Sequence, residues 1–444
     1  MSAAGLIVSA PASGSGKTTV TMALLRALVR RGLRVAAAKA GPDYIDPEFH
    51  AAATGRPCLN LDPWAMRPAT IARLIASRND ADLILCEGAM GLFDGIDARG
   101  TGSCADLAAA TGWPVVLVVD ASGQAASVGA LVAGFAAYRP DVDIAGIIFN
   151  RVGGARHAEL LAEAVRLAAP HVRRLGALPR DACLALPDRH LGLVQAREHA
   201  DLVSRLDHAA DRASQSIDLD ALVALARPAQ CASPDGPASA SPPVPPLGQR
   251  IAVAHDDAFA FAYPWLLESW RAAGAALSMF SPLRDETPPV EADAIYLPGG
   301  YPELHAARLA ANHRFLDGLR AAAQRGATIY GECGGYMVLG RTLTDAEGRT
   351  HALAGLLALD TSFATRRLIL GYRRAKLSTS GPLGPAGTCY RGHEFHYSTV
   401  TGEAPAAVLF EITDAGGRTM GAAGQRTGNV MGSFIHLVDR EPVW

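Results

Sequence analysis

The sequence predicts an α/β protein of two doubly wound domains, and three observations carry this prediction. Residues 8–19 form a glycine-rich loop ending in Lys17-Thr18-Thr19, between a short apolar run and a helical pattern, as in a phosphate-binding loop. Residues 327–340 place Gly-Glu-Cys333-Gly-Gly between a β-rich run and an apolar segment, as in a nucleophile elbow with cysteine in place of serine. Around both motifs, short apolar runs alternate with amphipathic segments, which is typical of parallel sheets covered by helices.

The N-terminal half alternates strand and helix patterns up to about residue 225. Continuous apolar runs predict buried parallel strands, and the alanine-rich amphipathic segments between them predict the covering helices. The predicted strands are Gly5–Val8, Arg34–Ala38, Leu83–Cys86, Val115–Val119 and Ile144–Phe149. The predicted helices include Val20–Arg31, Ala105–Thr111 and Ala125–Tyr138.

A proline-rich segment, residues 228–248, separates the two halves. Proline at this density removes backbone donors and blocks helices, so the segment is expected to form no regular element and to act as a semi-rigid linker. We therefore predict domains at residues 1–227 and 249–444. In the second domain the predicted strands are Arg250–Ala254, Ala294–Leu297 and Thr328–Tyr330, and a helix is predicted from about Tyr263 to Gly274.

Composition argues against a nucleic-acid-binding protein. The chain has 41 basic and 43 acidic residues and a formal net charge of −2, so its surface offers no general positive field. No basic run is interleaved with aromatic residues. Hydrophobic residues make up 49% of the chain, which lets each half bury a full core. These features favour an enzyme with a mixed surface and small-molecule partners.

The cysteines and the N-terminus favour a cytoplasmic protein. The seven cysteines, at positions 58, 86, 104, 183, 231, 333 and 389, include no CxxC pair, which argues against a disulfide framework or a zinc site. No basic region precedes the first strand, so no signal peptide is predicted. No apolar run approaches the ~20 residues of a membrane span, so we expect no membrane partner.

The first motif predicts the binding of ATP with Mg²⁺. Backbone N–H groups around Gly14, Ser15, Gly16 and Lys17 would surround the phosphates, and the Lys17 ammonium would neutralise them. The Thr18 hydroxyl is the expected Mg²⁺ ligand, and Thr19 completes the motif. The loop departs from the usual pattern at one place, because Pro11 stands where the first glycine is expected.

Polar residues follow three further predicted strands of this half, at the edge where open α/β sheets bind ligands. Residues 39–47 contain Lys39, Asp43, Tyr44 and Asp46, and beside a phosphate loop they predict a metal-and-phosphate site. Glu87, at the tip of the third strand, is predicted to reach Mg²⁺, and Asp94 follows in a glycine-rich turn. Asn150 ends another strand and is predicted either to contact a purine edge or to form a plain turn.

The second motif predicts nucleophilic attack by the Cys333 thiol. Backbone N–H groups of Gly300, in the segment Pro298-Gly-Gly-Tyr-Pro-Glu303, and of Gly334 could form an oxyanion hole. His436 lies ~100 residues after the cysteine and is the expected base of a thiol–imidazole pair. A nucleophile and an ATP loop in one chain suggest that one half supplies a reactive group that the other half uses.

Seven motifs, in order along nearly the whole chain, resemble one family. Residues 10–19, 39–47 and 86–95 resemble the synthetase domain of corrinoid amidases, which is similar to dethiobiotin synthetase. Residues 298–303, 331–336, 391–398 and 432–436 resemble their class I glutamine amidotransferase domain. Together they are similar to the a,c-diamide synthases that act on cobyrinic or hydrogenobyrinic acid in cobalamin biosynthesis.

The resemblance implies a ligase that forms carbon–nitrogen bonds with glutamine as amido donor. It implies that Cys333, with His436 as base, releases ammonia from glutamine, while ATP with Mg²⁺ phosphorylates a corrinoid acetate that ammonia then converts to the amide. A second cycle would amidate the other acetate. The metal or acyl-phosphate site would comprise Lys39, Asp43, Asp46 and Glu87, and the candidates for corrinoid contact would be Tyr44 and Asp94.

One departure from the family pattern leaves the third member of the triad open. Many class I glutaminases have a glutamate two residues after the histidine, where this chain has Val438. Either a Cys–His pair suffices, or another acid such as Glu394 or Asp439 orients the ring. Three other questions stay open at this level: whether the corrinoid contains cobalt, how ammonia travels, and the oligomeric state, with a homodimer among the options.

Other functions remain to be weighed against this one. A related amidase could act on another tetrapyrrole or on other corrinoid carboxylates, and a CTP-synthase-like enzyme shares both domain types but is expected to be longer. A protein of another class would be a regulatory P-loop ATPase with an inactive glutaminase-like domain. The retention of Cys333, His436 and the oxyanion glycines argues against that class.

Overall fold

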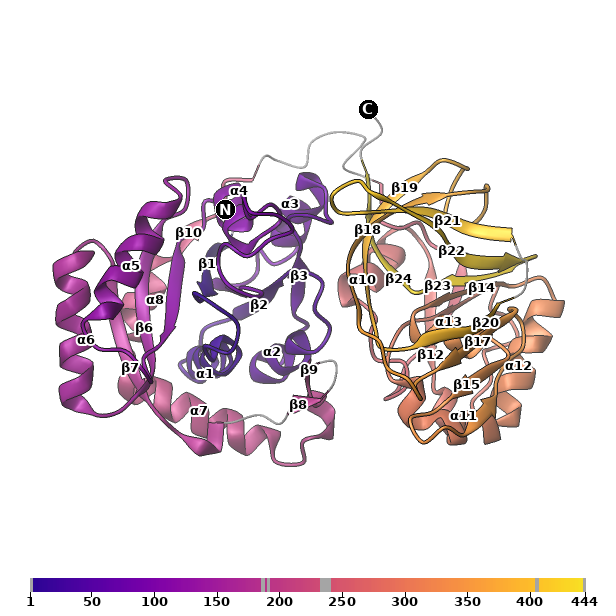
Figure 1. Ribbon diagram of the computed structural model, residues 1–444, viewed down its shortest axis with the longest axis horizontal. Coiled ribbons are helices and arrows are strands. Elements are labelled where there is room, and N and C mark those ends of the chain that lie inside the picture. Colours follow the sequence, from indigo (N-terminus) through magenta and orange to yellow (C-terminus); the bar gives the residue numbers. More distant parts are fainter. Residues whose placement is uncertain (1–2, 185–187, 190–191, 232–240, 404–406, 442–444) are drawn as a thin grey trace. The chain divides into compact units, whose positions relative to one another are not determined.

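The computed structural model describes residues 3–184, 188–189, 192–231, 241–403 and 407–441. The chain forms two compact units (Figure 1), unit 1 with residues 1–64 and 68–235 and unit 2 with residues 65–67 and 236–444. Part of the predicted linker, residues 232–240, lies outside the described residues. The linker prediction is wrong at its start, because Pro228 belongs to the short strand β10 (Arg227–Pro228), which pairs with β1 (Ala4–Ser9). At its end, Val244 is buried and accepts a hydrogen bond from Trp270 Nε1 at 3.0 Å.

Unit 1 is built on a parallel sheet in the order β3-β2-β4-β1-β5-β6-β7, with β10 antiparallel to β1. The strands that flank β1 are buried along most of their length, as the continuous apolar runs predicted. The other strands of this sheet are β2 (Val35–Ala40), β3 (Leu59–Leu61), β4 (Leu83–Glu87), β5 (Val115–Asp120), β6 (Ile144–Val152) and β7 (Arg173–Pro179). A separate pair consists of β8 (Asp188–Arg189) and β9 (Gly192–Leu193).

Helices cover both faces of this sheet, since α1 and α2 lie on one face and α3 and α4 on the other (Figure 1). This arrangement follows from right-handed crossovers, because the chain moves in one direction along the sheet from β1 to β3 and in the opposite direction after β3. The helices are α1 (Lys17–Arg30), α2 (Asp46–Thr54), α3 (Pro68–Ala76), α4 (Cys104–Thr111), α5 (Ser127–Tyr138), α6 (Ala155–Ala168), α7 (Leu202–Ser216) and α8 (Leu219–Leu225). Two short 3-10 helices are η1 (Ala182–Leu184) and η2 (Ala196–Glu198).

Unit 2 is built on a larger, mixed sheet in the order β12-β11-β13-β14-β23-β22-β21-β18-β19-β24. The first five strands are parallel and the rest pair antiparallel. These strands are β11 (Arg250–Ala254), β12 (Ala276–Phe280), β13 (Ala294–Leu297), β14 (Thr328–Glu332), β18 (Ile369–Leu377), β19 (Cys389–His396), β21 (Ala407–Asp414), β22 (Thr419–Thr427), β23 (Val430–Ser433) and β24 (Ile435–Arg440).

A second sheet of unit 2 has the order β16-β15-β17-β20. Its strands are β15 (Thr342–Thr344), β16 (Thr350–Ala352), β17 (Leu359–Ser362) and β20 (Thr399–Glu403). The helices of the unit are α10 (Pro264–Ala272), α11 (Ala306–Ala311), α12 (His313–Gln324), α13 (Gly334–Leu339), η3 (Pro282–Arg284) and η4 (Pro302–His305). Its apolar core gathers around β13, β14 and α13 and includes Ile295, Ile329 and Cys333.

The predicted α/β class with doubly wound domains is confirmed, and the predicted elements differ from the observed ones only at their ends. The predicted strand Arg34–Ala38 begins one residue early, and the predicted helix Val20–Arg31 begins three residues late because α1 starts at Lys17. The antiparallel strands of unit 2 were not predicted from the sequence. Across the described residues, no helix combines the length and apolar character needed to cross a bilayer.

Candidate active sites

The phosphate-binding loop lies between β1 and the first turn of α1, as predicted. Gly14 and Gly16 have φ values of 79° and 84°, a left-handed conformation that side-chain-bearing residues rarely adopt. A Cβ on Gly16 would also collide with the Asn150 side chain. The loop therefore forms despite Pro11, and it leads into a helix of 14 residues whose N-terminus favours anions.

The lysine of the loop turns back toward the loop backbone. Lys17 Nζ lies 3.3 Å from the carbonyl oxygen of Ala12, which also accepts a hydrogen bond from Ser15 Oγ at 2.9 Å. Burial lowers the pKa of Lys17, and the charge of Glu87 opposes that shift. Thr18 and Thr19 follow and are half-buried. The ammonium group is thus held across the loop, where phosphate oxygens would meet it.

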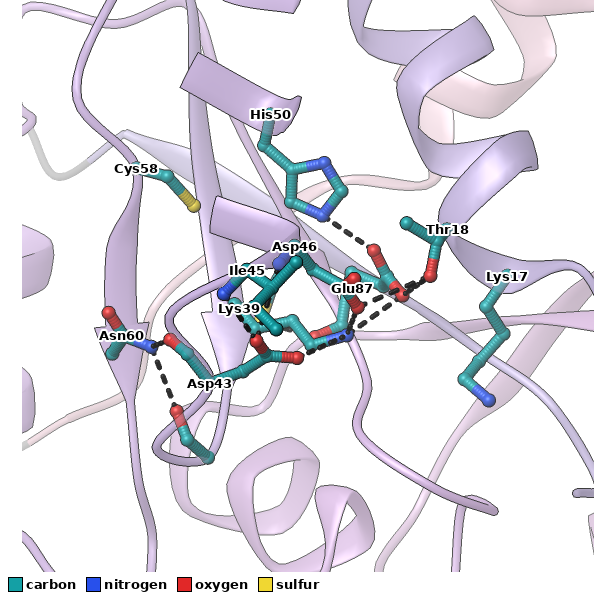
Figure 2. A network of polar contacts seen from close by, with 12 residues as sticks. Lys17, Thr18, Lys39, Asp43, Ile45, Asp46, His50, Cys58, Asn60 and Glu87 are labelled. Atoms are coloured by element: carbon teal, nitrogen blue, oxygen red, sulfur yellow. Dashed lines mark hydrogen bonds and ion pairs between the residues drawn. The ribbon is translucent and has the colours of Figure 1, made fainter. Parts of the chain in front are cut away.

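Four predicted site residues meet at the carboxyl ends of β2 and β4 (Figure 2). Thr18 Oγ1 donates to Glu87 Oε1 at 2.8 Å and lies 3.2 Å from Asp46 Oδ2. Lys39 Nζ lies 2.5 Å from Asp46 Oδ2 and 2.9 Å from Glu87 Oε1. Lys39 and Glu87 are register partners in the parallel pair, which explains why residues far apart in the sequence come together.

The charges of this cluster stabilise one another. Burial opposes the ionisation of Glu87, but the nearby Lys39 and His50 outweigh it and lower the pKa of the carboxyl group. Burial likewise opposes the charge of Lys39, and Asp46 and Glu87 raise the pKa of its ammonium well above the usual value. Glu87 and Lys39 therefore both stay charged around neutral pH.

The donor set fits a magnesium ion. Thr18 Oγ1, Asp46 Oδ2 and Glu87 Oε1 are hard oxygen atoms gathered in one place beside the phosphate loop, and Mg²⁺ prefers such ligands together with phosphate oxygens. Lys39 lies between the two carboxylates and balances their charge. The predicted metal residues are thus brought together by the structure.

Asp43, predicted for the metal or acyl-phosphate site, and the two corrinoid candidates Tyr44 and Asp94 have different environments. Asp43 Oδ1 accepts hydrogen bonds from the backbone of Ile45 and Asp46. Burial and the charge of Asp46 raise the pKa of Asp43 to about 7, although about a third of its side chain is exposed. Tyr44 beside it is half-buried. Asp94 is exposed and accepts a hydrogen bond from the Gly91 amide at 2.8 Å, so it closes its own turn.

Asn150 contacts the phosphate loop through its side chain. Its Nδ2 donates to the carbonyl oxygen of Ser15 at 2.9 Å, and its Oδ1 accepts from the amide of Arg151 at 3.0 Å. Both ends of the side-chain amide thus have partners within the protein. The predicted purine contact stays a prediction and would have to use the second lone pair of Oδ1 or the second Nδ2 proton.

Sequence reasoning missed a buried histidine in this site. His50 Nε2 lies 2.5 Å from Glu87 Oε2, on the side of the carboxylate away from Thr18 (Figure 2). Both side chains are fully buried. The signal was present in the sequence, because His50 stands four residues after Asp46 and so shares its face of α2.

The second site begins at a sharp turn between β14 and α13. Cys333 has φ 48°, a left-handed conformation that is strained for a residue with a side chain and typical of a nucleophile elbow. A Cβ on Gly335 would collide with the backbone of Leu297, so the turn needs glycine there. The Cys333 amide donates to the carbonyl oxygen of Ser433 at 2.8 Å and fixes the turn to β23.

The two predicted oxyanion glycines face each other beside this elbow. A Cβ on Gly334 would lie 3.0 Å from the backbone nitrogen of Gly300. The N–H group of Gly334 also lowers the pKa of the Cys333 thiol, although burial and the charge of Glu303 together raise it far more. The arrangement fits two N–H donors converging next to the nucleophile, and their role as an oxyanion hole stays a prediction.

His436 reaches the same place from β24. A Cβ on Gly299 would collide with Cε1 of His436 and would lie 3.2 Å from its Nε2 and 3.4 Å from Cys333 Cβ. The imidazole and the Cβ of Cys333 therefore border the same small space, and Cys333 Sγ lies 3.9 Å from the carbonyl oxygen of Phe395. The His436 ring stacks on its cross-strand partner His393, with centroids 4.8 Å apart and planes 7° apart.

Both members of this pair are neutral at rest. Burial and the neighbouring His393 lower the pKa of His436 well below its usual value, and burial raises the pKa of Cys333. A neutral imidazole beside a neutral thiol can act as a general base once a substrate is present. His393 is also neutral, since burial lowers its pKa to about 3, and its Nε2 lies 2.9 Å from the hydroxyl of Tyr263.

The two acids considered for the third position have other partners. Glu394 Oε2 lies 2.7 Å from Arg373 Nε, and its Oε1 lies 3.3 Å from His396 Nε2. Asp439 is fully buried and accepts from both the backbone and the guanidinium of Arg67, which belongs to the same unit. The carboxylate that faces His436 comes instead from Glu332, with Oε2 4.0 Å from His436 Nδ1.

Comparison with known proteins matches both units of the chain. Residues 6–194 match the model of the CobQ/CobB/MinD/ParA nucleotide binding domain, and residues 250–442 match that of the CobB/CobQ-like glutamine amidotransferase domain. A hydrogenobyrinate a,c-diamide synthase of Brucella anthropi is 56% identical over 438 residues, which is 98% of either chain. Its counterpart in Rhizobium meliloti is 51% identical over 440 residues, covering 98% of this chain and 99% of the relative.

The chain belongs to the family of hydrogenobyrinate a,c-diamide synthases. The resemblance inferred from the sequence motifs is thereby confirmed. The Lys17 loop and Glu87 lie within the segment that matches the nucleotide binding domain, and Cys333 and His436 lie within the segment that matches the amidotransferase domain. The family thus combines a nucleotide binding domain with a glutamine amidotransferase domain in each chain.

Proposed function

We propose that this chain converts the a and c acetate carboxylates of hydrogenobyrinic acid to amides, with ATP and glutamine as co-substrates. The observation that carries the proposal is the 56% identity, over almost the whole chain, to a protein named hydrogenobyrinate a,c-diamide synthase. The two sites described above supply the chemistry that such a reaction needs. We further propose that it works in the cytoplasm on small-molecule substrates.

The first site would activate the carboxylate. Lys17 and the N–H groups of the loop would hold the phosphates of ATP, as the geometry at the start of α1 allows. Thr18, Asp46 and Glu87 would hold Mg²⁺, which supplies charge neutralisation at the transferring phosphoryl group. Lys39 lies beside them and would neutralise the acyl phosphate.

The second site would supply ammonia. Cys333 would attack the side-chain amide of glutamine, and His436 would take the thiol proton and pass it to the leaving ammonia. The N–H groups of Gly300 and Gly334 would bind the developing oxyanion. The resting neutrality of the pair means that the proton moves only when substrate completes the site.

The test is amidation of hydrogenobyrinic and cobyrinic acids by the full-length protein, followed by mass spectrometry. With ATP, Mg²⁺ and glutamine, hydrogenobyrinic acid should gain two amides. Because one phosphate loop serves both acetates, a monoamide should appear transiently when the corrinoid exceeds the enzyme. A time course with only diacid and diamide would show that both amidations occur without release.

Two other results would replace the proposal. Amidation of a different tetrapyrrole, with none of either corrinoid acid, would identify a related amidase. ATP turnover without any glutamine hydrolysis would identify a regulatory ATPase with an inactive second domain. The left-handed backbone of Cys333 and its approach to His436 favour an active thiol site over that last alternative.

A further inference from the structure

We propose that Glu332 is the residue that orients His436, so that the thiol site contains a triad whose acid comes from the residue before the nucleophile. This inference rests on the proposed glutaminase role of Cys333 and His436. It assigns to Glu332 the task that many class I glutaminases give to an acid two residues after the histidine, where this chain has Val438. Glu332 is a positioning residue, because it acts on substrate only through His436.

The placement of the histidine ring carries the argument. One edge of the ring, with Cε1 and Nε2, faces Gly299 and the space that Cys333 borders. The other ring nitrogen, Nδ1, lies 4.0 Å from Glu332 Oε2, and both side chains are at most 3% exposed. A base that accepts a proton at Nε2 must carry its own proton at Nδ1, and a carboxylate at Nδ1 selects that tautomer.

The surroundings of Glu332 hold it as a carboxylate that can accept such a proton. The Tyr296 hydroxyl donates to Oε2 at 2.7 Å, and Oε1 accepts from the Tyr330 hydroxyl at 3.0 Å and from the Leu437 amide at 3.1 Å. A carboxylate offers about four lone-pair sites, so three donors leave room for one more. That remaining capacity lies on the side that His436 occupies.

The fold explains why these donors converge. Tyr296 and Tyr330 are register partners on the neighbouring strands β13 and β14, and their rings stack with centroids 6.1 Å apart. Tyr330 and Glu332 stand two residues apart on β14 and so share one face of the sheet. Leu437 follows His436 on β24, so the same short stretch presents the ring and a backbone donor to one carboxylate.

The neighbouring charged groups do not compete for this role. Glu394 is held by Arg373 and His396, and Asp439 by Arg67. No lysine or arginine of the described residues pairs with Glu332, and the titratable groups that face it are Tyr296, Tyr330 and His436. The next residue, Cys333, is neutral because burial raises its pKa. A positive charge that forms on His436 would therefore find Glu332 as its nearby counter-charge.

In the first half-reaction one proton moves from Cys333 to His436 and then to the nitrogen of the glutamine side chain. The Cys333 S–H bond breaks as Sγ bonds to the amide carbon of glutamine, and the proton moves to His436 Nε2. His436 keeps its Nδ1 proton, now directed at the Glu332 carboxylate, and then gives the Nε2 proton to the amide nitrogen. The C–N bond breaks, ammonia leaves, and a thioester remains on Cys333. The distance of 4.0 Å shortens to a hydrogen bond when substrate binds, as catalytic contacts commonly do.

Burial raises the pKa of Glu332 to about 7, and its donors only partly offset that shift. Its ionised fraction therefore changes within the range in which the enzyme can be assayed. If the carboxylate orients His436, glutaminase activity should fall as the pH drops through about 7. This fall in glutaminase rate below about pH 7 is the acid limb of the pH profile. If Glu332 only stabilised the fold, the acid limb would be absent.

The test compares Glu332→Gln with the wild-type protein over a range of pH, using glutamine hydrolysis and amidation from added ammonium. Glutamine keeps the volume of the side chain, but its amide N–H₂ directed at Nδ1 would select the wrong tautomer of His436. We expect kcat for glutamine to fall by about 10²-fold, with the KM little changed and the acid limb near pH 7 lost. Amidation from ammonium should be retained, which also shows that the variant is folded.

A matched control is Asp345→Asn. It removes another buried carboxylate that bonds a histidine in the same unit, His351 at 2.8 Å, on the separate small sheet. We expect glutaminase kcat and its pH profile to stay as in the wild type. A glutaminase kcat for Glu332→Gln within about threefold of the wild type, or a loss with the acid limb unchanged, would overturn the proposal.

A second variant keeps the proposal testable if Glu332→Gln does not fold. Tyr296→Phe removes one donor to Oε2 and leaves the ring packing in place, so the pKa of Glu332 should rise. The acid limb of glutaminase activity should then move to higher pH, while amidation from ammonium is unaffected. An unmoved limb in a folded Tyr296→Phe protein would show that Glu332 does not control the histidine. Absence of glutamine hydrolysis in the wild type would instead defeat the proposed function itself.

Discussion

Two buried glutamates occupy equivalent places in the two units and differ in their ionisation. Glu87 ends β4 and Glu332 ends β14, each at the carboxyl end of a parallel strand and just before a turn that contains glycine. Burial opposes ionisation at both. At Glu87 the cation Lys39, together with His50, outweighs burial and lowers the pKa, whereas at Glu332 neutral donors leave the pKa at about 7.

The difference shows how one fold position serves two kinds of chemistry. A strand end beside a buried lysine stays charged at all working pH values, which suits the binding of cations and phosphates. A strand end beside two tyrosines, one histidine and one thiol carries a carboxyl group that ionises near pH 7, so its charge can orient a neighbouring imidazole above that pH. Six variants would sharpen or break this comparison.

The largest effect is expected from the nucleophile. Cys333→Ala should lower glutamine-dependent amidation by about 10³-fold or more, because no other group at the elbow can form the thioester. Amidation from added ammonium should persist. Both are measured by mass spectrometry of the corrinoid product, with Cys389→Ala on β19 as the matched control in the same unit. Survival of both activities in Cys333→Ala would show that the thiol site lies elsewhere.

Lys17→Ala should affect the other unit alone. Loss of the ammonium group at the phosphate loop should lower amidation from glutamine and from ammonium alike, by about 10²-fold or more. Glutamine hydrolysis should remain at least partly intact, since Cys333 and His436 are untouched. ATP turnover and glutaminase activity are measured separately. Unchanged ATP turnover would remove the basis for calling the loop catalytic.

The two glutamates should also differ in their contribution to stability. Glu87→Gln leaves the buried Lys39 with fewer counter-charges and should cost about 3 kcal/mol of unfolding free energy. Glu332→Gln at pH 5, where the Glu332 carboxyl group is largely neutral, should change it by no more than about 1 kcal/mol. Calorimetric melting of both variants would test this. Equal losses would contradict the different ionisation of the two sites.

The pH dependence of stability follows with opposite signs. The pKa of Glu87 is lowered on folding, so its contribution is present above the ordinary glutamate range and lost only as the pH falls through its low folded value. The pKa of Glu332 is raised, so its contribution is present below that range and lost as the pH rises through about 7. Relative to Glu332→Gln, the wild type should therefore lose stability between pH 5 and 8.

The smallest effects are expected from the two acids first considered for the triad. Glu394→Gln and Asp439→Asn should each lower glutaminase kcat by less than about tenfold, far less than His436→Ala, because their carboxylates are held by arginines and not by His436. Steady-state glutaminase assays at pH 8 would measure this. A loss as severe as that of His436→Ala in either variant would show that it is the hidden third member.

Much of the fold was accessible from local patterns. Apolar runs and loop motifs predicted β1, β4, β11 and β13 to within a residue or two. A parallel strand that is buried on both faces consists of consecutive apolar residues, which can be recognised directly in the sequence. The antiparallel strands β18 to β22 were not predicted, because their residues are mixed in polarity and give no continuous apolar run.

The sequence by itself determined the chemistry of both sites, because Lys17, Thr18, Cys333 and their glycines stand together in short motifs whose backbone geometry they dictate. Only the tertiary structure decided which distant groups complete them. Pairing of β2 with β4 brought Lys39 to Glu87, and pairing of β14 with β23 and of β19 with β24 brought His436 to face Glu332. The reason is physical: the environment of a buried charge is set by neighbouring strands, and strand order is a property of the folded sheet.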